Sequence, residues 1–473
     1  MSGNDREVSS EVDFVSKVVS IPEYIYTEIS PVASNSFTLS ATAESTVTCK
    51  VGGGNEIPNP SLTHLSFLSQ TATGSVSAGT YFILNNCRLN SIQAVHGGIV
   101  LDSINNALEY SNAVAPACLD LQEFLLMDLG YSTGTTAIGV CEGMRRSNAL
   151  RAATGNVDMA IRHNNTQPRL QYTDFQYFQR QNLSAAGAKP ILQYKINLGL
   201  MFPHTWFSSA KDYCTGNRAI EYTFRFAPAQ NISFRVKFTG GVSHPASTAV
   251  TPVLSQTISN IKLICGMENN RPIADAIIKA YNSPGGYEYT YDSIQGSVST
   301  FTGLTHSPQL TINQSSGGFL KAVYWTHYNN TTTGASALEH NNLAGATTGM
   351  ISSFRILLNG RRIDSQYDIS YTQANQDGFK ILKPRFAQSC IGQCRDMMDY
   401  NFVWFSPFSE MSSVEMAKHN GDEEFGLPLK NMSYNYQIQC AMAGTSSTRR
   451  WFIWGIYTRR LRLASNSIPF FIY

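Results

Sequence analysis

A strict alternation of apolar and polar residues is the sequence feature that most constrains how this chain folds. In IEYTFRF, residues 220–226, every second side chain is apolar, and YNYQIQCAM, residues 434–442, keeps the same period. The alternation recurs in residues 37–51, 192–200, 234–238 and 451–461. A period of two gives a strand one buried and one exposed face, which is typical of antiparallel sheets. We therefore predict an all-β protein.

Helical patterns are few and short. Residues 115–130 and 271–282 carry apolar side chains at helical spacing, and Ser412 and Glu415 form the pattern of a capping box at the start of a third segment. Gly, Pro and Asn punctuate the strand patterns throughout, as expected for strands joined by loops. We expect short helices inserted in the loops of a β architecture.

One stretch of sixteen residues has a partner later in the chain. LNSIQAVHGGIVLDSI, residues 89–104, aligns without a gap with ISSFRILLNGRRIDSQ, residues 351–366, at an offset of 262 residues. The two copies share a turn glycine and an Asp-Ser pair, and Val95 meets Leu357. Each half also closes with two strong alternating strands, residues 192–200 and 220–226 in the first and 434–442 and 451–461 in the second. A repeat this long indicates a duplicated domain.

The duplication and the length together predict two consecutive sandwiches. The chain has 473 residues, and on the order of 200 residues for each half suits an eight-stranded β-sandwich with long loops. Residues 239–257 are rich in Gly, Pro, Ser and Thr, which is typical of a boundary. The predicted parts are an N-terminal arm over residues 1–20, a first sandwich over 21–245, a second over 246–463 and a C-terminal tail over 464–473.

The composition favours assembly over nucleic-acid binding. Charged residues make up only 14% of the chain, compared with about 25% in typical soluble domains. Sparse charge protects a free monomer poorly against association, so we expect part of the polar exterior to be buried against other copies. The net charge is +2, whereas a dedicated nucleic-acid-binding protein needs a strongly basic face.

The chain has no pattern of a secreted or membrane-spanning protein. Its first residues, MSGNDREVSSEVDFVSK, are polar and acidic, unlike a signal peptide, and no apolar run approaches the ~18 residues that span a bilayer. The nine cysteines are odd in number and lack framework spacing, which favours buried thiols over disulfides. We expect a protein that is not secreted and is used in the cytosol or nucleus.

Patterns of catalytic and metal-binding sites are missing from the sequence. It contains no HExxH, no phosphate loop, no nucleophile elbow and no EF-hand spacing. Cys390 and Cys394 have a spacing that zinc knuckles occasionally use, but no second Cys/His pair stands at a complementary distance. His64 and His327 lie within strand patterns. We therefore expect a protein that is not an enzyme and has no catalytic residue, cofactor or metal.

Arginines are the remaining polar residues whose pattern indicates a functional surface. The candidate residues for an inner face or an interface are Arg361, Arg362, Arg459, Arg460 and Arg462. Such arginines can contact genome phosphates, an inner membrane or acidic partners, or they can be inter-subunit and strand-edge charges. Where the second copy of the repeat has Arg361 and Arg362, the first has Ile99 and Val100. The repeated element is thus the turn, which favours the architectural interpretation.

Three segments resemble the double jelly-roll major capsid proteins of the lineage that joins adenoviruses, polinton-type elements, virophages and nucleocytoplasmic large DNA viruses. The first is YKINLGLMFPHTW with GNRAIEYTFRFA, residues 194–206 and 216–227. The second is the strand–helix–strand segment from residue 258 to 294, and the third is the later copy of the repeat with the aromatic-rich strands after it. The resemblance is one of pattern and order over most of residues 21–463.

The resemblance implies a structural subunit of an icosahedral DNA-virus shell. Three chains of two jelly rolls each would give a trimeric capsomer with six similar lobes, which can occupy a six-neighbour lattice position. The implied partners are two further copies in a homotrimer, neighbouring capsomers, minor capsid and penton proteins, and an inner membrane or the genome at the basic residues. The implied location is the virion, with assembly in the host cytoplasm or nucleus.

A second interpretation stays open at this point. Two β-sandwiches could form a carbohydrate-binding protein or a glycan-active enzyme, because exposed aromatic residues stack on sugars and sandwiches host many glycan functions. The two interpretations differ in the expected mass in solution. A capsid subunit is expected as a trimer of 52.1 kDa chains, and a glycan-binding protein as a monomer.

Overall fold

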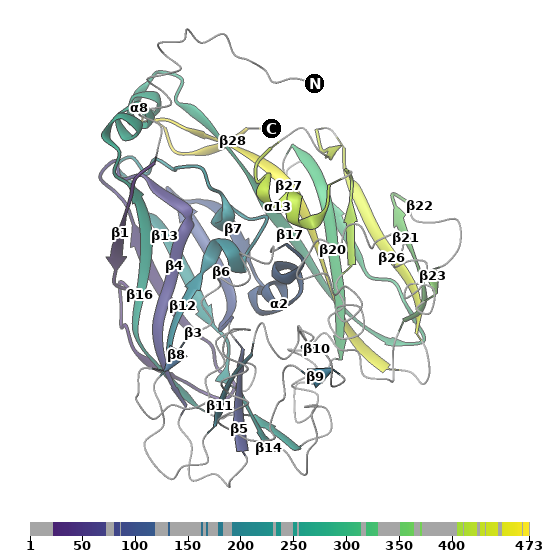
Figure 1. Cartoon of the computed structure of the whole chain (residues 1–473). Helices are drawn as coiled ribbons and strands as arrows, with labels where there is room; N and C mark the ends of the chain where they lie inside the picture. The colour runs from purple at the N-terminus through teal and green to yellow at the C-terminus, as the bar shows by residue number, and fades with distance from the viewer. Residues whose placement is uncertain are drawn as a thin grey trace.

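The computed structural model of the chain consists of two β-sandwiches that lie side by side, the first purple to teal and the second green to yellow in Figure 1. Structural statements concern the residues that it describes. These are residues 22–71, 80–85, 87–118, 131–132, 162–163, 167–168, 178–182, 192–229, 233–237, 249–252, 255–313, 318–329, 351–363, 369–370, 404–409, 411–422, 426–430, 432–442, 447–465 and 467–472.

The first sandwich has two antiparallel sheets. One contains, in spatial order, β1 (Tyr24–Ile29), β16 (Gln256–Glu268), β4 (Pro58–Thr71), β12 (Leu192–Asn197) and β8 (Tyr131–Ser132), with β2 (Phe37–Leu39) also beside β16. The other contains β3 (Ser45–Val51), β13 (Ile220–Phe226), β6 (Leu89–His96) and β7 (Ile99–Ile104). A small sheet extends this sandwich with β11 (Phe178–Asn182), β5 (Thr80–Asn85), β14 (Ser233–Lys237) and β15 (Ala249–Pro252). A separate two-stranded ribbon pairs β9 (Arg162–His163) with β10 (Gln167–Pro168).

The second sandwich repeats this strand order. Its first sheet contains β17 (Tyr287–Gly303), β27 (Ser447–Leu463), β20 (Phe319–Asn329) and β24 (Trp404–Pro407), with β25 (Leu427–Pro428) beside β20 and β28 (Phe470–Ile472) beside β27. Its second sheet places β18 (Thr305–His306) and β19 (Gln309–Ile312) beside β26 (Tyr434–Met442), followed by β21 (Ile351–Leu358), which pairs with β22 (Arg361–Arg362) and β23 (Ile369–Ser370). Thus β17-β27-β20-β24 corresponds to β1-β16-β4-β12, and β19-β26-β21-β22 corresponds to β3-β13-β6-β7. The prediction of two consecutive eight-stranded jelly rolls is confirmed.

The repeated stretch forms the same hairpin in both sandwiches. Val95 pairs with Val100 between β6 and β7, and Leu357 pairs with Arg362 between β21 and β22, which is one register at the predicted offset. The turns also agree. Gly97 and Gly98 have φ of +58° and +86°, and Asn359 and Gly360 have +51° and +75°. Two successive residues with positive φ form the tight hairpin turn that Asn-Gly and Gly-Gly favour.

The two pairs of closing strands, taken in chain order, are not equivalent in the structure. The counterpart of β26 is β13 rather than residues 192–200, and the counterpart of β27 is β16 rather than residues 220–226. Residues 192–200 themselves form β12 and then the single turn α6 (Leu198–Met201). The boundary at residue 245 stays a prediction. Because β15 and β16 follow it and yet pair with strands of the first sandwich, we propose that the first jelly roll continues to residue 268.

Two of the three predicted helices are present as expected. They are α8 (Arg271–Asn282) and α13 (Ser413–Lys418). A short 3-10 turn, η2 (Trp206–Ser208), lies in the first sandwich. At the start of α13, Ser412 Oγ accepts from the Glu415 amide while the Glu415 carboxylate accepts from the Ser412 amide, which confirms the capping box. The helix predicted over residues 115–130 overlaps only the end of α2 (Ala107–Cys118), and residues 119–130 lie outside the described part.

The hydrophobic core shows how the two sandwiches are joined. Along β27, Trp451 and Ile453 point into the interior of the second sandwich, whereas Phe452, Trp454 and Ile456 belong to the cluster that fills the first sandwich. The middle of this sheet, formed by β27, β20 and the first half of β17, is therefore buried on both faces.

The six described cysteines are buried free thiols, as predicted: Cys49, Cys87, Cys118, Cys214, Cys265 and Cys440. Cys141, Cys390 and Cys394 lie outside the described residues. Among the helices that the structure describes, none has the length and apolar character needed to cross a membrane.

Candidate functional site: the contact between the two sandwiches

Strand β7 of the first sandwich is held by two strands of the second. The carbonyl oxygen of Leu101 accepts a hydrogen bond from the Tyr291 hydroxyl of β17 at 2.7 Å and another from Arg459 Nη1 of β27 at 3.0 Å. Leu101 and Tyr291 are both fully buried. A buried carbonyl needs such partners because burying it without them costs free energy. These bonds therefore fix where β7 sits on the second sandwich.

Asp102, the next residue of β7, serves both sandwiches. Its carboxylate accepts from the Trp206 amide at 2.8 Å and the Ser103 amide at 3.0 Å in the first sandwich, and from Ser293 Oγ at 3.0 Å in the second. Burial raises the pKa of Asp102 to about 6, although these hydrogen bonds and the charge of Arg459 oppose the shift. A carboxylate in this position ties three segments together through directional bonds.

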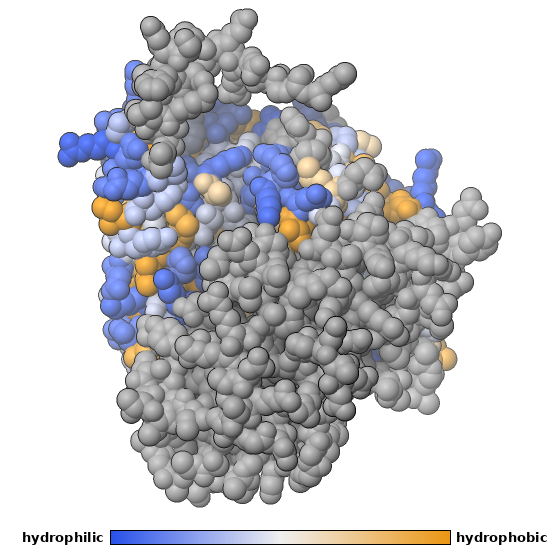
Figure 2. Space-filling view, viewed as in Figure 1, coloured by the Kyte–Doolittle hydropathy of each residue, from blue (hydrophilic) through white to orange (hydrophobic). Residues whose placement is uncertain are grey.

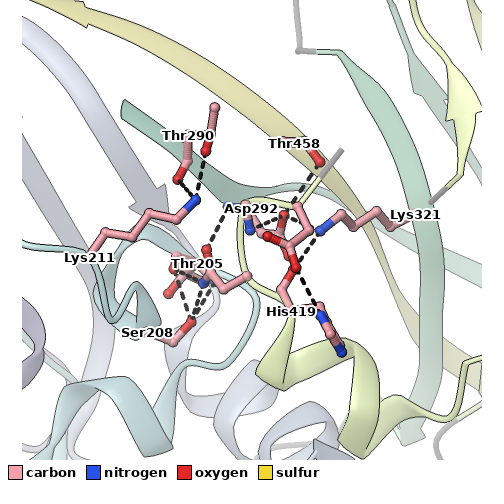
Figure 3. A network of polar contacts seen from close by, with 11 residues as sticks. Thr205, Ser208, Lys211, Thr290, Asp292, Lys321, His419 and Thr458 are labelled. Atoms are coloured by element: carbon pink, nitrogen blue, oxygen red, sulfur yellow. Dashed lines mark hydrogen bonds and ion pairs between the residues drawn. The ribbon is translucent and has the colours of Figure 1, made fainter. Parts of the chain in front are cut away.

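A buried ion pair lies at the centre of the network in Figure 3. Lys321 Nζ lies 2.8 Å from Asp292 Oδ1, and both side chains are almost completely inaccessible to solvent. The Lys321 ammonium also donates to the carbonyl of His419 at 2.9 Å, and Asp292 Oδ1 accepts from the Gly421 amide at 3.0 Å. Burial raises the pKa of Asp292, and the nearby ammonium offsets part of that rise. The pair thus anchors the loop that follows α13.

That loop reaches back to the first sandwich. Asn420 Nδ2 donates to the Thr205 carbonyl at 2.9 Å and to Ser208 Oγ at 2.8 Å, while its Oδ1 accepts from the Asp292 amide at 2.9 Å. Lys211 of the first sandwich donates to Thr290 Oγ1 at 2.7 Å. Figure 3 shows the Lys211–Thr290 bonds beside the network around Asp292. The contact is therefore specific in its geometry as well as apolar.

A thiol, an imidazole and a phenol meet beneath this network. His204 Nε2 lies 3.3 Å from Cys118 Sγ and 3.1 Å from the Tyr324 hydroxyl, and all three residues are buried. Burial, together with the charge of Lys321, lowers the pKa of His204 to about 3. An imidazole with such a low pKa is a poor proton acceptor, and a nucleophile needs access to its substrate. We interpret the cluster as packing between the sandwiches, since Cys118 and His204 belong to the first and Tyr324 to the second.

The candidate arginines of β27 lie at one end of this contact. Besides bonding Leu101, Arg459 places its guanidinium 3.8 Å above the ring of Phe471 in β28. Arg462 forms an ion pair with Glu288 at 2.9 Å and donates to the Gly285 carbonyl. Arg460 is half-buried and stands opposite Ile472 in the ladder with β28. These arginines hold neighbouring strands, and Arg459 joins the two sandwiches directly.

Arg361 and Arg362 occupy a different part of the molecule. They form β22, which pairs only with β21 among the described strands and belongs to the other sheet of the second sandwich. Arg361 is exposed and Arg362 is half-buried. Figure 1 shows β22 at the right-hand side, well separated from β28. The structure therefore does not bring the five candidate arginines into one site.

Sequence reasoning missed most of the contact because its residues share no motif. One further signal was present: YIYTEIS, residues 24–30, and YEYTYDS, residues 287–293, share two tyrosines, a threonine and a serine at an offset of 263 residues. These stretches form β1 and the start of β17, the corresponding edge strands of the two sandwiches. Within the described residues, no three His, Cys, Asp or Glu side chains gather in a way that could hold a metal ion.

Comparison with known proteins supports the assignment of the fold. No family model matches the chain, and no curated protein matches it. Among solved structures, the chain is similar to the Faustovirus major capsid protein with a TM-score of 0.50 and 11% identity, over 94% of this chain and 91% of that one. It is similar to a chain of the Sputnik virophage structure with a TM-score of 0.50 and 11% identity, over 95% and 88% of the two chains. Strand order and likeness together show that the chain has the double jelly-roll fold of the Faustovirus major capsid protein.

Proposed function

We propose that this chain is the major capsid protein of an icosahedral DNA virus and that three copies form one capsomer. The observation that carries the proposal is the pairing of two jelly rolls with one strand order, locked side by side by a sheet whose middle is buried on both faces. The same fold, over 94% of the chain, is found in a major capsid protein. A rigid pair of similar lobes is the unit from which three copies can build a ring of six.

The proposal extends to partners and location. Neighbouring capsomers would pack through the lateral surfaces, and minor capsid and penton proteins would complete the shell in the virion. Assembly would take place in the host cytoplasm or nucleus. For an inner membrane or the genome, the basic residues we propose are Arg460 and Arg462, which are half-buried beside β28.

The alternative of a glycan-binding protein is supported less well. Sugar sites in sandwiches depend on exposed aromatic platforms. All five tryptophans of this chain are buried: Trp206, Trp325, Trp404, Trp451 and Trp454. Each packs in one of the two hydrophobic clusters, so none offers a stacking surface.

The mass of the purified full-length chain in solution tests the proposal. Light scattering is expected to give three times 52.1 kDa at micromolar concentration, and negative-stain images should show particles with six lobes. A stable monomer that binds or hydrolyses glycans would contradict the proposal and support the alternative. Replacing Arg460 and Arg462 with Gln tests the contact beneath the shell, because it should weaken binding to anionic vesicles or DNA and leave the trimer intact.

A further inference from the structure

The contact between the two sandwiches has a counterpart that is left uncovered. We call β7 packed on β17 and β27 the internal contact. Because the strand order repeats, each side of the internal contact has an equivalent in the other sandwich. The equivalent of β7 is β22, and the equivalents of β17 and β27 are β1 and β16. Neither equivalent is covered in a single chain, as the following residues show.

On the β7 side, one position differs sharply in exposure. Leu101 is fully buried in the internal contact, and its equivalent at the offset of 262 residues, Ile363, is 42% exposed. Both residues follow the shared hairpin turn directly: Ile363 N bonds to Ile356 O at 3.1 Å, and Leu101 lies at a register shift between β6 and β7. Leu101 is covered by Tyr291 and Arg459 of the second sandwich, whereas no described strand of another sandwich covers Ile363.

On the β17 side, one tyrosine position shows the same difference. Tyr289 is 2% exposed, and its hydroxyl bonds to Ser209 Oγ at 2.8 Å and to the Lys211 carbonyl at 2.9 Å, both in the first sandwich. Its equivalent in the YIYTEIS stretch, Tyr26, is 52% exposed. Ile25 beside it is equally exposed. Figure 2 shows apolar residues at the left edge of the molecule, where Figure 1 places β1 and β16.

Strand β1 is also an open edge. Among the described strands it pairs only with β16, so its outer backbone groups face outward. Natural proteins protect an exposed, apolar edge strand or pair it with another chain. The charges also fit the proposed partner, since Glu23 is exposed just before β1 and Arg361 is exposed on β22, while Glu28 of β1 pairs with Lys262 of β16.

We infer that β22 of one copy docks on β1 and β16 of a second copy, and that this contact between chains repeats the internal contact. The inference rests on the proposed capsomer and names the surfaces that form it. Ile363 would be buried as Leu101 is, and Tyr26 would be covered as Tyr289 is. The contact joins two different surfaces, so it propagates from copy to copy and closes when the rotation completes a ring. With two lobes in each chain, three copies supply six.

Two charge-introducing variants test the inference. Tyr26→Asp and Ile363→Asp should each shift the mass measured by light scattering from three chains to one, because either change places a carboxylate in an apolar contact. The matched control is Val100→Asp, since Val100 is 39% exposed on β7 and is not covered by the internal contact. The control should remain trimeric. Retention of a trimer by both Tyr26→Asp and Ile363→Asp would overturn the inference.

Cross-linking provides a readout that does not depend on disrupting the fold. Glu28→Cys copies mixed with Ile363→Cys copies and treated with a bis-maleimide should give a two-chain product, and neither variant alone should give it. The wild-type chain controls for its native thiols. If the wild type is trimeric and the mixture gives no product above that control, the docking surface is wrong while the proposed function stands. A monomeric wild-type chain would instead contradict the proposed function itself.

Discussion

The two sandwiches share a strand order but differ in how their equivalent sheets are used. The middle of the sheet of β17, β27 and β20 is buried on both faces, and β27, predicted above to alternate, instead contains the nearly continuous apolar run WFIWGIY. The sheet of β1, β16 and β4 buries one face, and along β16 buried and more exposed residues alternate with two interruptions. Burial on two faces removes the alternation that burial on one face imposes. Of two equivalent sheets, the one with β27 thus lies in the interior of the molecule, and the one with β16 has a face exposed to solvent.

The equivalent tyrosines should show the largest difference between the sheets. Tyr289→Ala is expected to lower the free energy of unfolding by about 5 kcal/mol, because it opens a cavity and removes the hydroxyl that bonds to Ser209 Oγ and the Lys211 carbonyl. Tyr26→Ala should change the stability of a single chain by less than about 0.5 kcal/mol. Urea unfolding at several protein concentrations measures both. The Tyr26 effect should appear only where chains associate, and equal effects at all concentrations would contradict the comparison.

The next largest effect concerns the buried ion pair. Lys321→Met should cost about 3–4 kcal/mol, because it leaves the Asp292 carboxylate buried without its ammonium. The control Lys262→Met removes a partly exposed pair with Glu28 on the outer sheet and should cost less than about 1 kcal/mol. Adding Asp292→Leu to Lys321→Met should recover much of the loss. A double variant as unstable as the single one would show that packing, rather than the uncompensated charge, dominates.

The internal contact should also depend on pH through Asp102. Its pKa of about 6 in the folded chain lies above the ordinary value of 3.8, so the folded state holds the proton more tightly than the unfolded state. The contribution to stability is therefore complete below about pH 4 and lost as the pH rises through 6, an effect of about 2–3 kcal/mol. Buried His204, whose pKa is lowered to about 3, changes the stability in the opposite sense over this range, so the Asp102 effect is measured by chemical unfolding at pH 4 and pH 7 as the difference between the wild type and Asp102→Asn.

Asp102→Asn should lack this contribution, because the amide does not titrate, so the wild type should lose about 2–3 kcal/mol of stability relative to this variant between pH 4 and pH 7. The control Asp275→Asn removes an exposed carboxylate on α8 and should keep the pH profile of the wild type. Parallel pH profiles for the wild type and Asp102→Asn would show that Asp102 does not set the pH dependence.

The smallest expected loss of stability comes from replacing the glycines of the hairpin turns, and it should be equal in the two sandwiches. Gly98 and Gly360 have positive φ, and a Cβ added to either would have no atom within 4 Å. Gly98→Ala and Gly360→Ala should therefore each cost about 1–2 kcal/mol from backbone strain alone. Thermal unfolding of the two variants checks this. A difference greater than about 1 kcal/mol would indicate that the two hairpins are not equivalent.

Local patterns predicted the strands well. The bounds of β13 and β26 match the alternating stretches residue for residue, and the capping box placed the start of α13. Helix α2 was missed because it is buried on nearly every side: Leu108, Tyr110 and Val114 are all inaccessible, so the segment has no amphipathic period to detect.

The contact between the sandwiches could not be predicted in this way. The two partners of Leu101 lie 190 and 358 residues away in sequence, and no spacing rule connects them. The arginines attracted notice because charge is sparse in this chain, and of the five only Arg459 lies in the internal contact. Most hydrogen bonds across the contact are made by tyrosine, serine and backbone carbonyl groups. Such groups are common along the whole sequence, and only their positions in the fold bring them into the contact.

The placement of Arg459 has a consequence for how the chain reaches its final form. Strand β7 is complete by residue 104, yet one of its anchors is supplied by a residue near the other end of the polypeptide. During synthesis, the side of the first jelly roll that carries β7 therefore stays exposed until almost the whole chain has left the ribosome. Contacts of such long sequence separation slow folding and prolong the exposure of apolar surface. A chain truncated before residue 459 would lack this anchor of β7.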